Sequence, residues 1–264
     1  MERIASRHNP IVKRFRDLAR PGSSAGAMLL DGEHLIEDAL GAAVPIEIAV
    51  FADRLAGERF RSLAARTAAA GARTIAVPDQ VLAAISPVKN PSGAVAIGRY
   101  RTASLAEILG ASSPLILVLH EIQDPGNVGA VVRAAEACGA SGIVTSDASA
   151  DPFGWKALRG AMGSTFRLPI AVRQPLAAVV DQAHTAGIRV FASVPRGGTS
   201  LALADLRGPA AVVLGGEGSG LPDALVAMAD ERLTIPMRGS VESLNVATAA
   251  ALIVYEAARQ RSSH

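Results

Sequence analysis

The second half of the chain alternates short, almost purely apolar runs with segments of helical periodicity. Continuous apolar runs are expected in parallel strands covered on both faces, whereas strands with one exposed face alternate apolar and polar residues. We therefore predict an open, parallel α/β sheet with helices on both faces. The expected strands are 115–120, 142–146, 167–172, 188–193, 210–215 and 232–236. The expected helices are 128–137, 176–186, a short one from Pro222 and a long one at 244–260.

Residues 1–100 show a similar alternation and predict a smaller α/β domain. A loop is expected at 86–93 (SPVKNPSG), which is rich in turn-forming residues. The chain should therefore divide into a domain at 1–100, a linker at 101–113 and a larger domain at 114–264. In the first domain, helices are expected at 8–20, 34–40 and 55–70, and strands at 27–30, 46–51, 73–77 and 95–97.

Positive charge gathers at the front of the chain. The 264 residues carry 26 Lys plus Arg against 24 Asp plus Glu, a formal net charge of only +2. Most charges of residues 1–20 are nevertheless basic, and those of 8–20 lie between apolar side chains at helical spacing. This pattern indicates a basic amphipathic helix, which is suited to binding the phosphates of a nucleic acid.

Several protein classes are excluded or disfavoured. Cys138 is the single cysteine, so intramolecular disulfides and multi-cysteine zinc sites are excluded. The histidines are scattered, only His120 lies beside a motif, and we expect no metal site. No apolar run reaches the ~18 residues of a membrane span, and the start has no secretory apolar region. We therefore expect a cytoplasmic protein that does not enter the membrane.

The first motif, at 120–140, follows an expected strand directly. Asp124 to Asn127 (DPGN) form a turn, and Asn127 is placed to cap the next helix. Arg133 projects from that same helix. Taken alone, this motif indicates only a turn, a cap and a surface arginine.

The second motif, at 212–225, is an apolar strand followed by a run rich in glycine. Gly215 and Gly216 let the backbone approach a ligand closely. The glycine spacing matches neither GxGxxG nor a phosphate-binding P-loop, and Glu217 would repel a phosphate. A cationic or neutral nucleoside ligand suits this loop better, although a tight turn explains the glycines equally well.

The third motif, at 235–261, ends in a long helix rich in alanine. Ser243 and Asn245 lie at the mouth of this helix, where polar side chains commonly act as caps. Each of them alone is most simply interpreted as a capping residue. The helix itself is suited to the core or to a close contact between two helices.

Together the three motifs resemble the SpoU/TrmH family of S-adenosylmethionine-dependent RNA ribose 2′-O-methyltransferases, a branch of the SPOUT superfamily. The DPGN run with Arg133, the glycine-rich run at 215–220 and the IPM and SLNV runs of 235–246 carry the resemblance, which covers 114–261. LRGAMGSTFRLPI at 158–170 is similar to the family's middle segment. Three stretches, 6–18, 29–40 and 86–93, are similar to the substrate-binding domain of members that act on large-subunit rRNA.

The resemblance implies a deep trefoil knot in the C-terminal segment, S-adenosylmethionine as the cofactor, RNA as the substrate and a homodimer formed through the C-terminal domain. The resemblance assigns Arg133 as the key residue, in some accounts as the base. Because a guanidinium holds its proton, we expect Arg133 instead to stay charged, bind the target phosphate and stabilise the developing alkoxide. The implied catalytic residues are Arg133, Asn127, Glu217, Ser243 and Asn245. The implied cofactor contacts are Gly215, Gly216, Ile235, Met237 and Leu244. The implied RNA contacts are Arg7, Lys13, Arg14, Arg16, Lys89 and Arg159.

Three alternatives remain beside an enzyme that methylates 23S-type rRNA. One is a tRNA 2′-O-methyltransferase, although minimal tRNA enzymes of the family lack the extra N-terminal domain. Another is a catalytically silent RNA-binding protein of the same fold, which the complete motif set disfavours. The last is a dinucleotide-dependent oxidoreductase, which the missing GxGxxG after the first strand of the larger domain disfavours.

Overall fold

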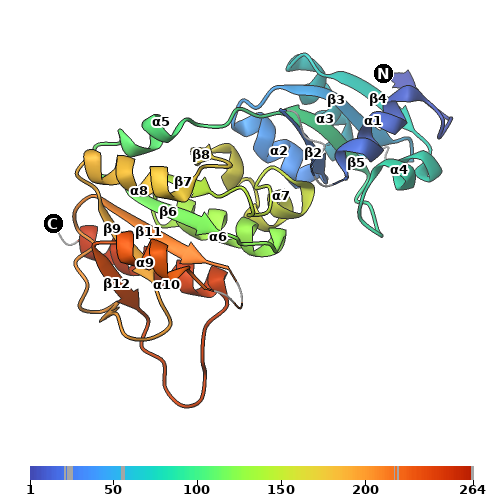
Figure 1. Ribbon diagram of the computed structural model, residues 1–264. Coiled ribbons are helices and arrows are strands. Elements are labelled where there is room, and N and C mark those ends of the chain that lie inside the picture. Colours follow the sequence, from blue (N-terminus) through green and yellow to red (C-terminus); the bar gives the residue numbers. More distant parts are fainter. Residues whose placement is uncertain (21, 23–25, 55–56, 217, 219, 263–264) are drawn as a thin grey trace. The chain divides into compact units, whose positions relative to one another are not determined.

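Two separate β-sheets form in the computed structural model, which describes residues 1–20, 22, 26–54, 57–216, 218 and 220–262 (Figure 1). The chain divides accordingly into two units. Unit 1 comprises Met1–Arg101 together with Phe153–Phe166. Unit 2 comprises Thr102–Pro152 together with Arg167–His264.

The sheet of unit 2 has the strand order β10-β12-β9-β11-β6-β7-β8 among the described residues. Every neighbouring pair in this sheet is parallel, and the central strands β6 and β11 are almost wholly buried. The parallel α/β architecture predicted from the apolar runs is thus confirmed. The strands are β6 (Leu115–His120), β7 (Gly142–Thr145), β8 (Ile170–Ala171), β9 (Arg189–Ser193), β10 (Thr199–Ser200), β11 (Ala210–Gly215) and β12 (Glu231–Thr234).

Helices cover the sheet of unit 2 (Figure 1). Helices α5 and α8 share an apolar core with Ile116 and Val118 of β6, while α10 packs against α6 and β11. The buried side of α10 is formed by small and branched side chains such as Ala250, Ile253 and Val254. The helices are α5 (Leu105–Leu109), α6 (Pro125–Ala137), α8 (Leu176–Thr185), α9 (Asp223–Met228) and α10 (Val246–Arg261).

Part of the stretch expected to be a linker, 101–113, is a helix of unit 2. Ser104 caps α5, because its hydroxyl accepts from the Glu107 amide at 3.2 Å while the Glu107 carboxylate accepts from the Ser104 amide at 2.6 Å. The buried side chains of this helix are Leu105 and Ile108, and it packs against β7 and β8. The Ser-x-x-Glu capping box was the available sequence signal, but the helix is too short to show a period.

Unit 1 has a mixed sheet with the order β1-β4-β3-β5-β2, in which β5 runs antiparallel to β2 and β3. The smaller α/β domain is therefore present. The strand β1, of two residues, and the helix α4, of seven, were not predicted. The strands are β1 (Glu2–Arg3), β2 (Ala27–Asp31), β3 (Ile46–Ala52), β4 (Arg73–Val77) and β5 (Ala94–Arg99). The helices are α1 (Pro10–Leu18), α2 (Glu33–Gly41), α3 (Glu58–Ala69), α4 (Asp79–Ile85) and α7 (Trp155–Ala161), followed by a 3₁₀ turn at Ser164–Phe166.

The expected basic amphipathic helix is α1. Asn9 caps it by accepting from the Ile11 amide at 2.9 Å, and Pro10 occupies its first turn. Val12 and Phe15 are buried in the core of unit 1. Because these two side chains occupy the inner face, Lys13 and Arg16 lie exposed on the outer one.

Residues 153–166 belong to unit 1, although the expected division at 114 assigned them to the larger domain. The rings of Phe153 and Tyr100 stack with centroids 3.8 Å apart. Trp155 Nε1 donates to the Ala19 carbonyl at 3.2 Å, and Leu158 is fully buried. These contacts join segments far apart in the chain, so local periodicity could not reveal them.

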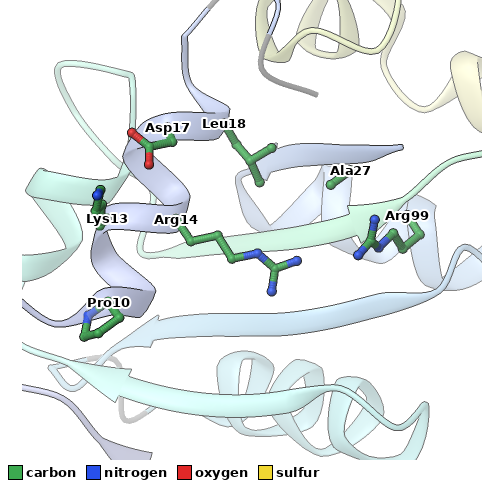
Figure 2. Close-up of a pocket in the computed structure, with 7 residues that line it drawn as sticks. All are labelled: Pro10, Lys13, Arg14, Asp17, Leu18, Ala27 and Arg99. Carbon is green, nitrogen blue, oxygen red and sulfur yellow. The ribbon is translucent and has the colours of Figure 1, made fainter. Parts of the chain in front are cut away.

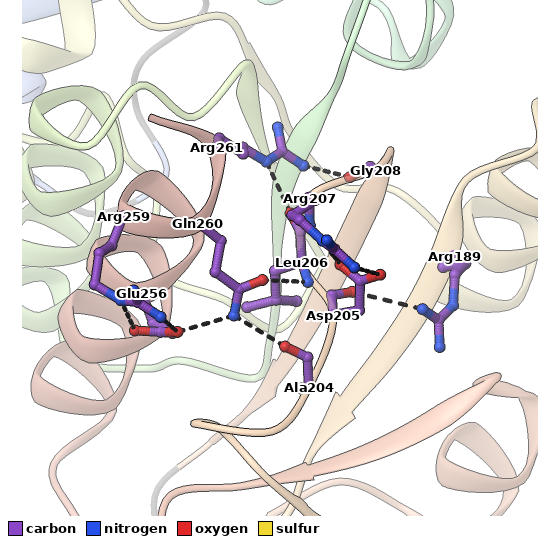
Figure 3. A network of polar contacts seen from close by, with 10 residues as sticks. All are labelled: Arg189, Ala204, Asp205, Leu206, Arg207, Gly208, Glu256, Arg259, Gln260 and Arg261. Carbon is purple, nitrogen blue, oxygen red and sulfur yellow. Dashed lines mark hydrogen bonds and ion pairs between the residues drawn. The ribbon is translucent and has the colours of Figure 1, made fainter. Parts of the chain in front are cut away.

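The C-terminal end of α10 is joined to the residues just before β11 by a polar network (Figure 3). Arg261 donates to four backbone carbonyls, those of Leu206 at 2.9 Å, Ser113 at 2.9 Å, Pro114 at 3.3 Å and Gly208 at 2.5 Å. Burial lowers the pKa of this guanidinium from its usual value. These bonds hold the last turn of the helix where it is.

Replacing Arg261 with alanine is expected to reduce the free energy of unfolding by about 2–3 kcal/mol, because hydrogen bonds from a charged donor are lost and carbonyl acceptors lose their partner. Chemical denaturation measures the effect. Arg259→Ala is the matched control on the same turn of helix. Arg259 pairs with the neighbouring Glu256 at 2.7 Å and is 57% exposed, so its loss should cost at most about 1 kcal/mol. An equal fall in the free energy of unfolding in the two variants would contradict the anchoring role of Arg261.

Candidate active site

The strand order of unit 2 reverses between β6 and β11. From β6 the chain proceeds to β7 and β8 on one side, whereas β11, β9 and β12 lie on the other. Open α/β sheets bind ligands beyond the carboxyl ends of the strands at such a reversal. Gly215, at the end of β11, stands in register with His120, at the end of β6. The first and second sequence motifs therefore begin side by side.

The turn that follows β6 is held by serines from the loop after β7. Glu121 has a φ of 55°, in the left-handed region that is uncommon for residues other than glycine. Its amide donates to Ser146 Oγ at 3.1 Å, and the Ile122 amide donates to Ser149 Oγ at 3.3 Å. The two serines thus fix the path from β6 into α6. Sequence reasoning missed them because the contact depends on the pairing of β6 with β7.

Asp124, and not Asn127, caps α6. The Asp124 carboxylate accepts from the Asn127 amide at 2.9 Å, and the helix already begins at Pro125. The Asn127 side chain instead accepts a hydrogen bond from Asn245 Nδ2 at 3.1 Å. Asn245 caps α10 at the same time, since its Oδ1 accepts from the amides of Ala247 and Thr248 at 2.9 and 3.3 Å. One amide side chain therefore starts the last helix and also joins the third motif to the first.

Arg133 lies on α6, exposed, one and a half to two helical turns beyond Asn127. It makes no hydrogen bond or ion pair with any residue that the structure describes. A guanidinium is always charged and offers a planar fork of donors that matches phosphate. The side chain is therefore available to an anionic ligand.

The glycine-rich loop after β11 folds back closely on itself. Gly216 and Gly220 form a bridge, in which the Gly220 amide donates to the Gly216 carbonyl at 3.2 Å. A Cβ on Gly215 would lie 2.4 Å from the Gly220 carbonyl carbon, and one on Gly216 would lie 2.4 Å from the Glu121 carbonyl oxygen. Only glycine fits these two positions. The predicted catalytic residue Glu217 lies outside the described residues.

The predicted residues of the third motif differ in their surroundings. Ile235, Met237 and Leu244 are half-buried in the loop between β12 and α10. Ser243 is exposed and hydrogen-bonds no residue in the described part of the chain, so the structure does not join it to the contact between Asn127 and Asn245. Capping falls to Asn245 alone. A role for Ser243 in binding or catalysis stays a prediction.

The predicted cofactor contacts combine glycine backbone with apolar side chains. Gly215 and Gly216 offer backbone amides and carbonyls where no side chain intervenes, and Ile235, Met237 and Leu244 offer partly exposed apolar surface. Such a neutral set of groups suits the purine nucleoside of S-adenosylmethionine better than a pyrophosphate. In the described residues no group of three His, Cys, Asp or Glu could hold a metal ion. No helix in that part of the chain is long and apolar enough to cross a membrane.

The ring nitrogens of His120 are buried beside this site. Its side chain is only 14% exposed, and neither ring nitrogen bonds to a residue that the structure describes. The nearest carboxylate, that of Glu121, lies 3.7 Å away. His120 therefore places two buried ring nitrogens beside the site without a partner in the described chain.

The predicted RNA contacts all lie in unit 1, because α7 carries Arg159 into that unit. Arg7 donates to the Gln80 carbonyl at 3.0 Å, and Arg14 pairs with Glu47. The remaining contacts, Lys13, Arg16, Lys89 and Arg159, are exposed. The predicted catalytic and cofactor residues, in contrast, all belong to unit 2.

Comparison with known proteins identifies both parts of the chain. Residues 114–255 match the SpoU rRNA Methylase family, and residues 9–96 match the MRM3-like substrate binding domain. The chain is 30% identical over 257 residues to the 23S rRNA (guanosine(2553)-2′-O)-methyltransferase RlmP of Bacillus subtilis, which covers 97% of this chain and 98% of that protein.

Solved structures agree with this assignment. An AdoMet-bound rRNA methyltransferase from Sinorhizobium meliloti is 31% identical with a TM-score of 0.88, over 98% of this chain and 97% of that one. The SpoU methyltransferase AviRb from Streptomyces viridochromogenes, in complex with AdoMet, is 28% identical with a TM-score of 0.88, over 97% of this chain and 99% of that one. The motif resemblance is thereby confirmed, and the chain belongs to the SpoU rRNA methylase family.

Proposed function

We propose that this protein methylates a ribose 2′-hydroxyl of 23S-type large-subunit rRNA in the cytoplasm, using S-adenosylmethionine. The hydrogen bond between Asn245 and Asn127 is the observation that carries the proposal, because it joins the third motif to α6, the helix that also carries Arg133. The match of 9–96 to a substrate-binding domain and the 23S rRNA activity of the relative RlmP favour rRNA over tRNA. The same pair of motifs disfavours a silent RNA-binding protein.

When bound, S-adenosylmethionine supplies an electrophilic methyl group on a sulfonium sulfur. Gly215 and Gly216 would bind it through their backbone, and Ile235, Met237 and Leu244 through apolar contact. The remaining task of the chain is to orient the ribose and to stabilise the negative charge that develops on its oxygen.

We assign that task to Arg133. Its guanidinium binds the phosphate next to the target ribose and stabilises the developing alkoxide. Because a guanidinium holds its own proton, the hydroxyl proton passes to the phosphate or to water. Asn127, held by Asn245, orients Arg133 or the ribose. Ser243 would complete this polar group once the ribose is bound. The role proposed for Glu217 stays a prediction, since Glu217 lies outside the described residues.

Mapping of 2′-O-methyl positions in 23S rRNA tests this function directly. We expect one ribose to lose its methyl group in a strain that lacks the gene, and to regain it when the purified protein and S-adenosylmethionine are added to the unmodified rRNA. S-adenosylhomocysteine should raise the melting temperature, and NAD should not. Loss of a tRNA methyl group with intact 23S rRNA would select the tRNA enzyme, and no change in either RNA would contradict both.

We also propose a homodimer formed through α10. Two large apolar side chains on this helix face solvent, Tyr255 at 64% and Leu252 at 42% exposed, although the opposite side of the helix is buried in the core. α10 of a second copy is the simplest partner that would bury both side chains, since a two-fold interface uses the same surface patch on each subunit. In the family, this pairing would complete each site.

Tyr255→Glu is expected to convert the dimer to a monomer, because two like charges would meet where apolar surface was buried. Analytical ultracentrifugation measures the change. Leu203→Glu is the matched control, since Leu203 is 81% exposed but lies outside α10. A wild-type monomer at micromolar concentration, or a dimer that survives Tyr255→Glu, would contradict the proposed interface.

A further inference from the structure

Unit 1 contains an open pocket of about 370 Å³ that the proposed methyl transfer does not use (Figure 2). It lies between α1 and the ends of β2 and β5. Lys13 and Arg14 of α1 and Arg99 of β5 supply its basic side chains. Pro10, Leu18 and Ala27 supply its apolar surface. The volume falls in the range of small-molecule pockets in proteins.

The two guanidinium groups of the pocket are held by one carboxylate. Arg14 and Arg99 both donate to Glu47 of β3, and Figure 2 shows the two arginines extending toward one another. Burial acts to raise the pKa of Glu47, but the hydrogen bonds and charges of Arg99 and Arg14 outweigh it and lower this pKa. The carboxylate therefore stays ionised at neutral pH. Guanidinium groups fixed in this way lose little conformational freedom when a ligand binds.

Positive charge is in excess around the pocket. Lys13 makes no hydrogen bond or ion pair with a described residue, and Glu47 is shared by Arg14 and Arg99. Asp17, the acidic residue that lines the pocket, lies 3.4 Å from Arg20 and is partly neutralised by it. A phosphate at the mouth of the pocket would thus meet the charge of Lys13, which no described residue compensates, beside two guanidinium groups that share one carboxylate.

The apolar surface indicates that more than a phosphate binds here. Leu18 and Pro10 lie on the same helix as Lys13 and Arg14, so one ligand can touch both kinds of surface. A nucleotide has this combination, because its base is flat and weakly polar on its faces while its phosphate is anionic. An acidic peptide would pair with the basic side chains of the pocket, but it would offer no planar group to its apolar surface.

We infer that this pocket binds one nucleotide of the RNA substrate, with the phosphate at Lys13, Arg14 and Arg99 and the base against Leu18. The inference rests on the proposed function, in that the substrate is RNA. It adds a defined nucleotide site within unit 1, apart from the methyl-transfer residues of unit 2.

The test measures the affinity of the full-length protein for a 23S rRNA fragment and for uridine and guanosine 5′-monophosphates, at several salt concentrations. Lys13→Gln and Arg14→Gln should each weaken RNA binding roughly tenfold and reduce the salt slope by about one. Leu18→Ala should weaken binding without changing the slope, because it removes no charge. Arg66→Gln, an exposed arginine on α3, is the control for lost net charge and should stay close to wild type. Lys13 is exposed and unpaired in the described chain, so its variant should fold normally.

Each other outcome overturns the inference in a distinct way. If the pocket variants bind RNA as tightly as Arg66→Gln does, the nucleotide site is disproved. The proposed function would still hold in that case, provided that the wild type binds and methylates rRNA. A wild type that neither binds nor methylates rRNA would overturn both. If the pocket variants lose affinity for the monophosphates but keep their affinity for RNA, the pocket is a site for free nucleotides. An acidic peptide that binds as tightly as the RNA, and is lost in the same variants, would show a protein-binding site.

Discussion

Replacing Arg133 with alanine is expected to lower kcat for rRNA methylation by about 10³-fold, because the developing alkoxide loses a preorganised cation. Affinity for S-adenosylhomocysteine and the melting temperature should stay unchanged, since the side chain bonds to no residue in the described chain. Methyl incorporation from labelled S-adenosylmethionine measures kcat. Isothermal titration and thermal unfolding measure the other two quantities.

Arg133→Lys separates charge from geometry. Lysine keeps the charge but not the planar fork, so we expect about a hundredfold loss if bidentate phosphate binding orients the ribose. Arg66→Ala is the matched control, an exposed helical arginine outside the site, and should turn over normally. Near-normal turnover of Arg133→Lys would exclude the orienting role. A large fall in cofactor affinity in Arg133→Ala would place this residue in the cofactor site instead.

Gly215→Ala is expected to weaken S-adenosylhomocysteine binding about a hundredfold, which corresponds to about 2.7 kcal/mol. The new Cβ would lie 2.4 and 2.6 Å from the carbonyl carbon and oxygen of Gly220 and 2.7 Å from the Leu221 amide nitrogen. These are backbone atoms and cannot rotate away as a side chain would. The loop must therefore open where the cofactor contacts are proposed, and overpacking of this kind costs about 1–3 kcal/mol of stability.

Gly208→Ala is the matched control for this substitution. Gly208 lies just before β11, and a Cβ there would meet nothing within 4 Å. Its cofactor affinity and melting temperature should match those of the wild type. If Gly215→Ala lowers the melting temperature but keeps its affinity for S-adenosylhomocysteine, the glycine loop serves only the fold and the proposed cofactor contact at Gly215 is wrong.

Local pattern predicted the strands of unit 2 more accurately than the boundaries between units. The runs at 115–120 and 210–215 coincide with β6 and β11, because a strand buried on both faces must be apolar throughout. The run at 167–172 yields only the two-residue strand β8. The expected knot stays a prediction, since it depends on the path of the chain and not on any local pattern.

The candidate site was predicted only in part, because local pattern locates a motif but not its tertiary contacts. Each motif could be located from its position after an apolar run, but the capping residue of α6 was predicted as Asn127 and is Asp124. The error is physical in origin, because both residue types cap helices and the choice depends on where the first helical residue falls. Ser146 and Ser149 could not be found at all, since neither belongs to a motif and both act across two strands.

The sequence by itself determined the α/β class, the basic helix α1 and the order of the three motifs, because apolar periodicity, charge and turn chemistry are properties of neighbouring residues. Only the tertiary structure decided that Asn245 reaches Asn127 across 118 positions of sequence and that residues 153–166 complete unit 1. It also decided that Arg14 and Arg99 share Glu47. Contacts of this kind follow from how strands and helices pack, and no local pattern records them.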